Sequence, residues 1–241
     1  FHGERDGFFY QRSSNPTTRQ LELTLAALQG REDCIACASG VAAIHGALLA
    51  LTAQGDHVVL FMESYGPTRL FVRRTLARFG VRHTLLSIDD AEGLERTLAA
   101  TPTKLVVFET PTNPVGKVAD LEALCASARR HGALTLLDNT WAGPHQHGQY
   151  DLDLYLHSLT KHASGHGDAM GGAVIGSEAL LRRMRGEFTH LGAVLDPHAA
   201  FLLQRGLRTY LLRYRAQSAA ALRVARHLAG HPSVAAVYYP G

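Results

Sequence analysis

The amino-acid sequence predicts an α/β protein built around a mostly parallel β-sheet. Short apolar segments alternate with amphipathic ones along most of the 241 residues, which is typical of repeated βαβ units. Residues 133–137 are nearly all apolar, as expected for a strand that is buried on both faces. We expect strands at residues 33–38, 57–62, 81–87, 104–109, 133–138 and 173–176.

Helices are expected between these strands, at residues 21–28, 41–53, 68–79, 91–100 and 121–131. Thr17 and Thr18 are candidates for the cap of the first helix. A long helix is expected at residues 207–228, and we interpret its arginines as a solvated face, namely Arg208, Arg213, Arg215, Arg223 and Arg226. Residues 234–237 are strand-like, and the chain looks cut at both ends, so we expect a fragment.

The composition indicates a globular enzyme-sized protein and no special partner. The chain is 46% hydrophobic and 19% charged, with a formal net charge of +3, and no apolar run approaches the roughly 20 residues of a membrane span. We therefore expect neither a membrane nor a nucleic acid as partner. The pair Cys34 and Cys37 has no second pair beside it, and residues 145–147 (HQH) are interpreted as a surface turn, so no metal site is expected. Three cysteines without a signal-peptide pattern favour a cytoplasmic location.

Two residues near the end of the expected sheet predict a cofactor site. Asp138 closes a buried strand, where an acid can hold a pyridine nitrogen protonated, and Lys161 follows one strand later, where its amine can bind an aldehyde covalently. Ser158 and Thr160 precede the lysine and can donate hydrogen bonds to a phosphate. Ligands of open α/β sheets bind at this carboxyl edge. Taken together, although not singly, these residues predict a pyridoxal 5'-phosphate site.

Two further segments are expected at the same edge. Ser39, Gly40 and Val41 open a helix of small residues, whose free N–H groups can bind a phosphate, although an ordinary capped helix would have the same sequence. Tyr65 follows the second expected strand, where it can stack on a pyridine ring or be a half-buried loop residue.

The order and spacing of these motifs resemble the cystathionine synthase and lyase family, the Cys/Met-metabolism group of pyridoxal phosphate enzymes. The resemblance covers essentially the whole chain. It rests on residues 10–12 (YQR), 15–17 (NPT), 39–41 (SGV), 65–66 (YG), 109–114 (ETPTNP), 138–140 (DNT), 158–161 (SLTK) and 165–168 (GHGD). It implies the large domain of fold type I, the aspartate aminotransferase-like fold, with the C-terminal domain largely missing. The implied domains are an N-terminal arm at residues 1–20, a cofactor-binding domain at 21–206, and a linking helix with the start of the C-terminal domain at 207–241.

The resemblance also implies roles for single residues. Lys161 would carry the cofactor and move protons, Asp138 would pair with the pyridine nitrogen, and Tyr65 would stack on the ring. Asn113 would lie near the phenolic oxygen of the cofactor. The phosphate would be held by Ser39, Gly40, Val41, Ser158 and Thr160.

Tyr10 and Arg12 would reach the phosphate of a neighbouring subunit, which implies a homo-oligomer with shared sites, a dimer commonly within a tetramer. His162 stands where the family usually has tyrosine, and Gly167 where it commonly has serine. Both departures would alter the pocket without removing the lysine. The arginine that binds the substrate carboxylate in this family lies in the C-terminal domain, outside this chain.

The motifs give a split signal for the reaction. Residues 139–141, 165–170, 191–196 and 205–209 look closer to β-lyases, whereas residues 15–17 and 109–114 look closer to γ-acting members. The leading expectation is a carbon–sulfur lyase of the cystathionine β/γ-lyase type, which acts on a sulfur amino acid and releases a thiol, ammonia and a keto acid. A γ-replacement transferase, such as a cystathionine γ-synthase or an O-acylhomoserine sulfhydrylase, is the nearest alternative. A non-catalytic module that retains the fold is an alternative of another class.

Overall fold

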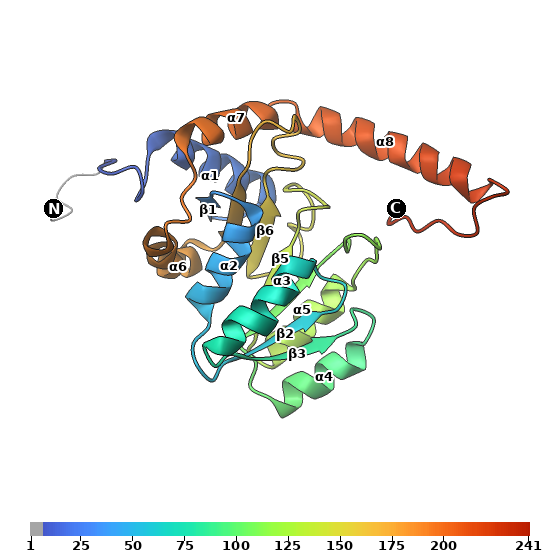
Figure 1. Ribbon diagram of the computed structural model, residues 1–241, viewed down its shortest axis with the longest axis horizontal. Coiled ribbons are helices and arrows are strands. Elements are labelled where there is room, and N and C mark those ends of the chain that lie inside the picture. Colours follow the sequence, from blue (N-terminus) through green and yellow to red (C-terminus); the bar gives the residue numbers. More distant parts are fainter. Residues whose placement is uncertain (1–6) are drawn as a thin grey trace.

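A computed structural model describes residues 7–241 and confirms the α/β class with a mostly parallel sheet (Figure 1). The strand order in the seven-stranded sheet is β1-β7-β6-β5-β4-β2-β3. Strands β2 to β6 pair in parallel, and β7 lies antiparallel between β6 and β1. The strands are β1 (Asp33–Cys37), β2 (His57–Phe61), β3 (Arg82–Leu86), β4 (Leu105–Glu109), β5 (Leu134–Asp138), β6 (Leu154–Ser158) and β7 (Gly172–Gly176).

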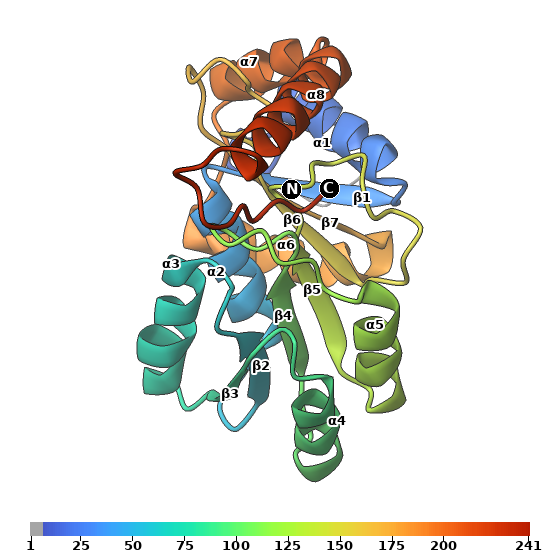
Figure 2. The same cartoon turned by 90° about the vertical axis from the view of Figure 1, so that its right-hand side faces the viewer.

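Helices cover both faces of the sheet, as Figures 1 and 2 show. One apolar core lies between the sheet and the helices α1 (Pro16–Gln29), α4 (Ala91–Ala100), α5 (Leu121–Arg130) and α7 (Pro197–Leu207). The other lies between the sheet and α2 (Gly40–Leu51), the π-helical turn η1 (Phe71–Leu76) and α6 (Glu178–Leu191). The turn η1 continues the short helix α3 (Gly66–Leu70). The central strands are apolar on both sides because each side faces one of these cores.

The first helix begins earlier than the sequence predicted. Asn15, and not Thr17 or Thr18, is its N-cap, because the Asn15 side chain accepts a 2.9 Å hydrogen bond from the backbone N–H of Thr18. Pro16 then occupies the first helical position, where its missing N–H costs nothing. The helix therefore starts within the segment that was expected to be an arm.

The C-terminal segment also differs from the prediction. The single helix expected at residues 207–228 is two helices, α7 and α8 (Tyr210–Ala229), and α8 extends away from the sheet (Figure 1). Arg208, Arg215, Arg223 and Arg226 are exposed, as expected. Arg213 is not, and its contacts are described below. The strand expected at residues 234–237 is absent from the described structure, since no strand lies there to pair with it.

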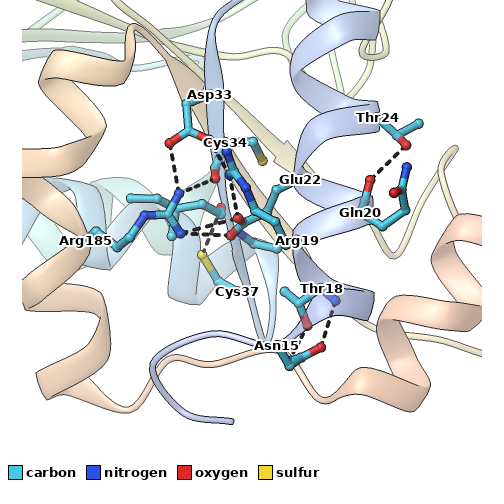
Figure 3. A network of polar contacts seen from close by, with 12 residues as sticks. Asn15, Thr18, Arg19, Gln20, Glu22, Thr24, Asp33, Cys34, Cys37 and Arg185 are labelled. Carbon is cyan, nitrogen blue, oxygen red and sulfur yellow. Dashed lines mark hydrogen bonds and ion pairs between the residues drawn. The ribbon is translucent and has the colours of Figure 1, made fainter. Parts of the chain in front are cut away.

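Four charged side chains join α1 and α6 to the edge strand β1 (Figure 3). Arg185 of α6 donates to the carboxylates of Glu22 and Asp33 at 3.1 and 3.0 Å, and Arg19 donates to the same two carboxylates. Glu22 also accepts the backbone N–H of Ala36 at 3.0 Å. Burial alone would raise the pKa of Asp33, but the hydrogen bonds from Arg19 and Arg185 lower it. The network thus compensates two carboxylates that the fold buries.

The cysteines of β1 and the histidines of residues 145–147 are held in the fold by packing and by hydrogen bonds. Cys34 and Cys37 are buried in β1 and belong to opposite cores, so their side chains point away from each other. His145 and His147 are half-buried rather than on a surface turn, because His147 Nδ1 lies 2.7 Å from Asn139 Oδ1 and His145 Nδ1 lies 2.6 Å from the hydroxyl of Tyr210.

None of the described helices combines the length and the apolar character that a membrane crossing requires. Within residues 7–241, no three histidine, cysteine or acidic side chains gather in a way that would hold a metal ion.

Candidate cofactor and active site

The strand register brings the predicted site residues to one edge of the sheet. Glu109 ends β4 directly opposite Asp138, which ends β5. Ser158 ends β6 opposite Gly172, and Cys37 at the end of β1 also pairs with Gly172. The N-terminus of α2 follows β1 after two residues, so it lies beside the end of β6. Parallel strands place their carboxyl ends together, and this is why residues far apart in sequence meet here.

A cavity of about 290 Å³ opens at this edge. It is lined by the predicted residues Ser39, Gly40, Val41, Tyr65, Asn113, Asp138, Ser158, Thr160 and Lys161. The structure therefore brings together all the predicted site residues of the chain except Tyr10 and Arg12.

One end of the cavity is shaped to receive an anion. The backbone N–H groups of Gly40 and Val41 at the start of α2 have no hydrogen-bond partner within residues 7–241, whereas Ser39 caps the helix by accepting the N–H of Ala42 at 3.0 Å. A Cβ atom on Gly40 would lie 2.7 Å from Cβ of Ser158, so only glycine lets the helix start approach that strand end. Free N–H groups at a helix N-terminus favour a bound phosphate.

The middle of the cavity holds two carboxyl groups. Burial, and then the charge of Asp138, raise the pKa of Glu109 to about 8, although backbone N–H groups of Tyr65 and Asn113 oppose the shift. Burial likewise raises the pKa of Asp138, against hydrogen bonds from Thr140. Neither carboxylate forms an ion pair within the described chain, and two neighbouring acids disfavour each other's ionisation. A cationic group bound here would relieve that repulsion.

Tyr65 and Lys161 are exposed residues that line the cavity on either side of the acid pair's strands. Tyr65 is 40% exposed and begins α3, and its backbone N–H donates a 2.7 Å hydrogen bond to Oε2 of Glu109. Lys161 is exposed, and its Nζ makes no hydrogen bond or ion pair to any residue between 7 and 241. Its backbone N–H donates to the carbonyl oxygen of Ser158 at 3.3 Å, which ties the lysine to the end of β6. The amine is therefore free to react.

Tyr10 and Arg12 lie outside this cavity. Arg12 stacks over the Tyr10 ring, 5.2 Å from its centroid, and donates a 3.1 Å hydrogen bond to the carbonyl oxygen of Thr189. Tyr10 is 52% exposed. Neither residue reaches the anion-binding end of the cavity in its own chain.

Five residues that were not predicted also line the cavity, namely Glu109, Thr140, Ile44, Leu156 and Met170. Glu109 and Thr140 belong to the motifs at residues 109–114 and 138–140, and their positions at or just after strand ends indicate that they face the same edge. Thr140 fixes the end of β6, because its hydroxyl accepts the backbone N–H of Ser158 at 2.8 Å.

A second cavity of about 310 Å³ adjoins the first. The two share Glu109, Asn113, Thr140 and Lys161, and the second adds Trp141 and His162. His162 packs edge-on against the ring of Tyr214, with 5.6 Å between ring centroids, and burial lowers its pKa. The side chain that stands where the family usually has tyrosine therefore borders the space next to the lysine.

These observations fit pyridoxal 5'-phosphate. The free N–H groups at the start of α2 suit the phosphate, the uncompensated acid pair suits a protonated pyridine nitrogen, and the unpartnered Lys161 amine suits an aldehyde. Within the described chain, none of these three features, the N–H groups, the acid pair or the lysine amine, has a hydrogen-bonding or charged partner of the kind that the cofactor would supply.

Comparisons with known proteins point the same way. The L-methionine gamma-lyase of Pseudomonas putida is 42% identical over 246 residues, which cover 100% of this chain and 61% of the relative. The chloroplastic cystathionine gamma-synthase 1 of Nicotiana tabacum is 38% identical over 239 residues, covering 98% of this chain and 44% of the relative. A crystal structure of cystathionine gamma-lyase from Lactobacillus plantarum, complexed with L-serine, superposes with a TM-score of 0.94 at 33% identity and covers 99% of this chain and 63% of that one.

The chain thus spans about 61% of the length of the Pseudomonas lyase. The structural neighbour confirms the fold expected from the sequence, that of pyridoxal phosphate-dependent lyases and synthases of sulfur amino acids. A family model described as "Cys/Met metabolism PLP-dependent enzyme" matches residues 1–241, and the chain therefore belongs to this pyridoxal phosphate-dependent family.

Proposed function

We propose that the protein is a pyridoxal phosphate-dependent carbon–sulfur lyase of the cystathionine β/γ-lyase type. It acts on a small sulfur amino acid and releases a thiol, ammonia and a keto acid. The observation that carries the proposal is one cavity in which Asp138, Lys161 and the free N–H groups of α2 face the same space. The lyases among the similar proteins support the reaction class.

Each group in the cavity has a proposed role. The bound cofactor supplies an electron sink for bonds at the substrate Cα. Asp138 holds the pyridine nitrogen protonated, because an ionised acid within hydrogen-bond reach stabilises the positive charge. Lys161 Nζ would hold the cofactor covalently and, once released from it, would move the proton of the substrate Cα. Tyr65 would stack on the cofactor ring, and the Tyr65 hydroxyl would assist proton transfer.

The remaining contacts fix the cofactor in the cavity. Asn113 would lie near its phenolic oxygen. Its phosphate would be bound by the N–H groups of Gly40 and Val41 and by the side-chain hydroxyls of Ser39, Ser158 and Thr160, all of which line the cavity. Excess negative charge at a helix N-terminus is stabilised by the helix dipole.

Assembly, domain organisation and location belong to the same proposal. Tyr10 is exposed, and Arg12 contacts Tyr10 and the carbonyl oxygen of Thr189, both away from the cavity of their own chain. We therefore assign both residues to the phosphate of a neighbouring subunit, in a dimer of shared sites within a tetramer. The cofactor-binding domain covers residues 21–206, between an N-terminal arm at 1–20 and the segment 207–241 that leads into a C-terminal domain. The described cysteines are all free and buried, which suits a cytoplasmic location.

A γ-replacement transferase is the second candidate. The similarity to a plant cystathionine gamma-synthase favours it, and its cofactor contacts would be the same. A non-catalytic module is disfavoured because Lys161, Asp138 and Tyr65 are all present and line one cavity.

An assay of the full-length protein distinguishes the two reactions. Keto acid release is measured from cystathionine and from methionine, and thiol incorporation is measured with an activated homoserine. The lyase proposal predicts keto acid and free thiol without an added second substrate. Product that forms only when a thiol and an activated homoserine are both supplied would establish the transferase instead.

A further inference from the structure

The loop that follows Lys161 is held by one arginine of α8. Arg213 Nη1 and Nη2 donate to the carbonyl oxygen of His162 at 3.0 and 3.1 Å. Nη2 also donates to the carbonyl oxygens of Gly206 at 2.8 Å and Ala163 at 3.4 Å. Its Nε donates to the hydroxyl of Thr209 at 3.1 Å. A single guanidinium therefore joins the lysine loop, the end of α7 and the start of α8.

Two glycines make room for this contact. Gly165 has φ of +70°, and a Cβ atom there would overlap the guanidinium of Arg213. A Cβ atom on Gly206 would overlap the carbonyl oxygens of Ala163 and Ser164. The lysine loop can approach α7 this closely because Gly206 carries no side chain, and Gly165 leaves the space that the guanidinium of Arg213 occupies.

Other hydrogen bonds also restrain the loop near the lysine. The Thr160 hydroxyl accepts the backbone N–H of Gly171 at 3.3 Å, and the Ser164 hydroxyl donates to Oδ1 of Asp168 at 3.0 Å. The backbone N–H groups of Ser164 and Gly165 donate to the carbonyl oxygens of Leu159 and Lys161, each at 2.9 Å, and form a turn around the lysine. The exposed Lys161 side chain itself is unpartnered in the described chain. The Arg213 cation donates hydrogen bonds to three carbonyl groups, those of His162 and Ala163 in the turn and that of Gly206 in α7. Charged hydrogen bonds of this kind are roughly twice as strong as neutral ones. The planar fork also fixes the direction of approach, which a lysine cannot do.

We propose that Arg213 is a positioning residue, which holds the Lys161 turn so that the amine points into the cofactor cavity. Arg213 lines neither of the two cavities and has no hydrogen bond to Lys161 in the described chain, so it acts through the main chain of His162 and Ala163. The inference rests on the proposed function in one respect, namely that Lys161 is the residue that carries the cofactor.

The test compares Arg213→Ala, Arg213→Lys and Arg223→Ala in the full-length holoenzyme. Arg223 is the matched control, since it is an exposed arginine of the same helix without a hydrogen-bond partner in residues 7–241. Hydrogen exchange is measured on peptides that cover residues 159–166. The proposal predicts exchange at least about tenfold faster in Arg213→Ala, an intermediate effect in Arg213→Lys, and no change in Arg223→Ala.

A spectroscopic readout separates positioning from general stability. The pH midpoint of the cofactor absorption change is titrated in each variant, together with kcat and KM. We expect the midpoint to shift and kcat to fall by more than KM changes in Arg213→Ala, with partial recovery in Arg213→Lys. Wild-type exchange and midpoint in Arg213→Ala would overturn the proposal. Full recovery in Arg213→Lys would overturn it too, because charge alone would then suffice.

The proposed function is tested separately in the wild-type protein. Borohydride reduction must first place the pyridoxyl label on the Lys161 peptide. A label elsewhere would contradict the function, whereas a label on Lys161 with an unaffected Arg213→Ala variant would contradict only the positioning role.

Discussion

The backbone N–H of Tyr65 donates a 2.7 Å hydrogen bond to Oε2 of Glu109. This bond ties the start of α3 to the end of β4, so the ring proposed to cover the cofactor is positioned by an acid that also faces Asp138. Glu109 therefore joins two parts of the site that arise from separate segments of the chain.

Glu109 gives the cofactor-free protein a distinct pH dependence. The pKa of Glu109 is raised to about 8 by burial and by Asp138, and its unfolded pKa is about 4.3. The folded state thus binds more protons than the unfolded state between these values, and stability must fall as the pH rises from about 4.3 towards about 8. We expect the urea midpoint of the cofactor-free form to fall over this range, and Glu109→Gln to reduce the slope. The slope that remains in the variant comes from Asp138, whose pKa burial also raises. An equal slope in the variant would mean that another group titrates.

Asp138 should matter for turnover more than for binding. Removing a charge that stabilises the electron sink typically costs about 100-fold or more in rate. We expect Asp138→Ala to retain some cofactor, measured by absorbance, and to lose about that factor in kcat. Asp138→Asn keeps the shape of the side chain without its charge, so it should lose a similar factor. Near wild-type kcat in both variants would show that another group stabilises the pyridine nitrogen.

The sheet and the cavity were predictable because their signals are local or repetitive. Alternating apolar segments define βαβ units, and parallel strands force their carboxyl ends together, so Asp138 and Ser158 were expected at one edge. The contacts of Arg213 were not predictable, because an arginine on an amphipathic helix is expected to be solvated until the fold brings carbonyl groups to it. Asn15 was missed as a cap because two threonines that follow it have the same capping chemistry.

The ion-pair network that joins α1, β1 and α6 should contribute strongly to the free energy of unfolding (Figure 3). In Arg185→Met, the buried carboxylates of Glu22 and Asp33 lose a cation, which typically costs about 3 kcal/mol of unfolding free energy. Arg182→Met is the matched control, because within residues 7–241 Arg182 pairs only with the exposed Glu178 on the same helix. Denaturant unfolding measures both, and equal losses would contradict the special role of Arg185.

The stabilisation that this network provides should be lost in acid. The pKa of Asp33 is lowered in the folded protein, so its contribution is fully present above the unfolded pKa of about 3.9 and is lost as the pH falls through the lower folded value. The difference in stability between wild type and Arg185→Met, measured by urea unfolding, should therefore shrink below about pH 4. A difference that stays constant down to pH 2 would exclude Asp33 as its source.

Subunit exchange tests the proposed shared site. Arg12→Ala should weaken cofactor affinity, and Lys161→Ala should be inactive. In a mixed dimer, one site receives Lys161 from one chain and Arg12 from the other, both unaltered, so mixing the variants should restore part of the activity. No recovery after complete exchange, verified by native mass spectrometry, would place Arg12 outside the neighbouring site.

The identity of the cofactor-bearing lysine is the central claim, and borohydride reduction followed by peptide mapping tests it most directly. We predict that the full-length protein is yellow, that reduction fixes a pyridoxyl group on the peptide containing Lys161, and that Lys161→Ala loses both the absorption band and the label. A label on any other lysine, or an unchanged absorption band in Lys161→Ala, would contradict the account.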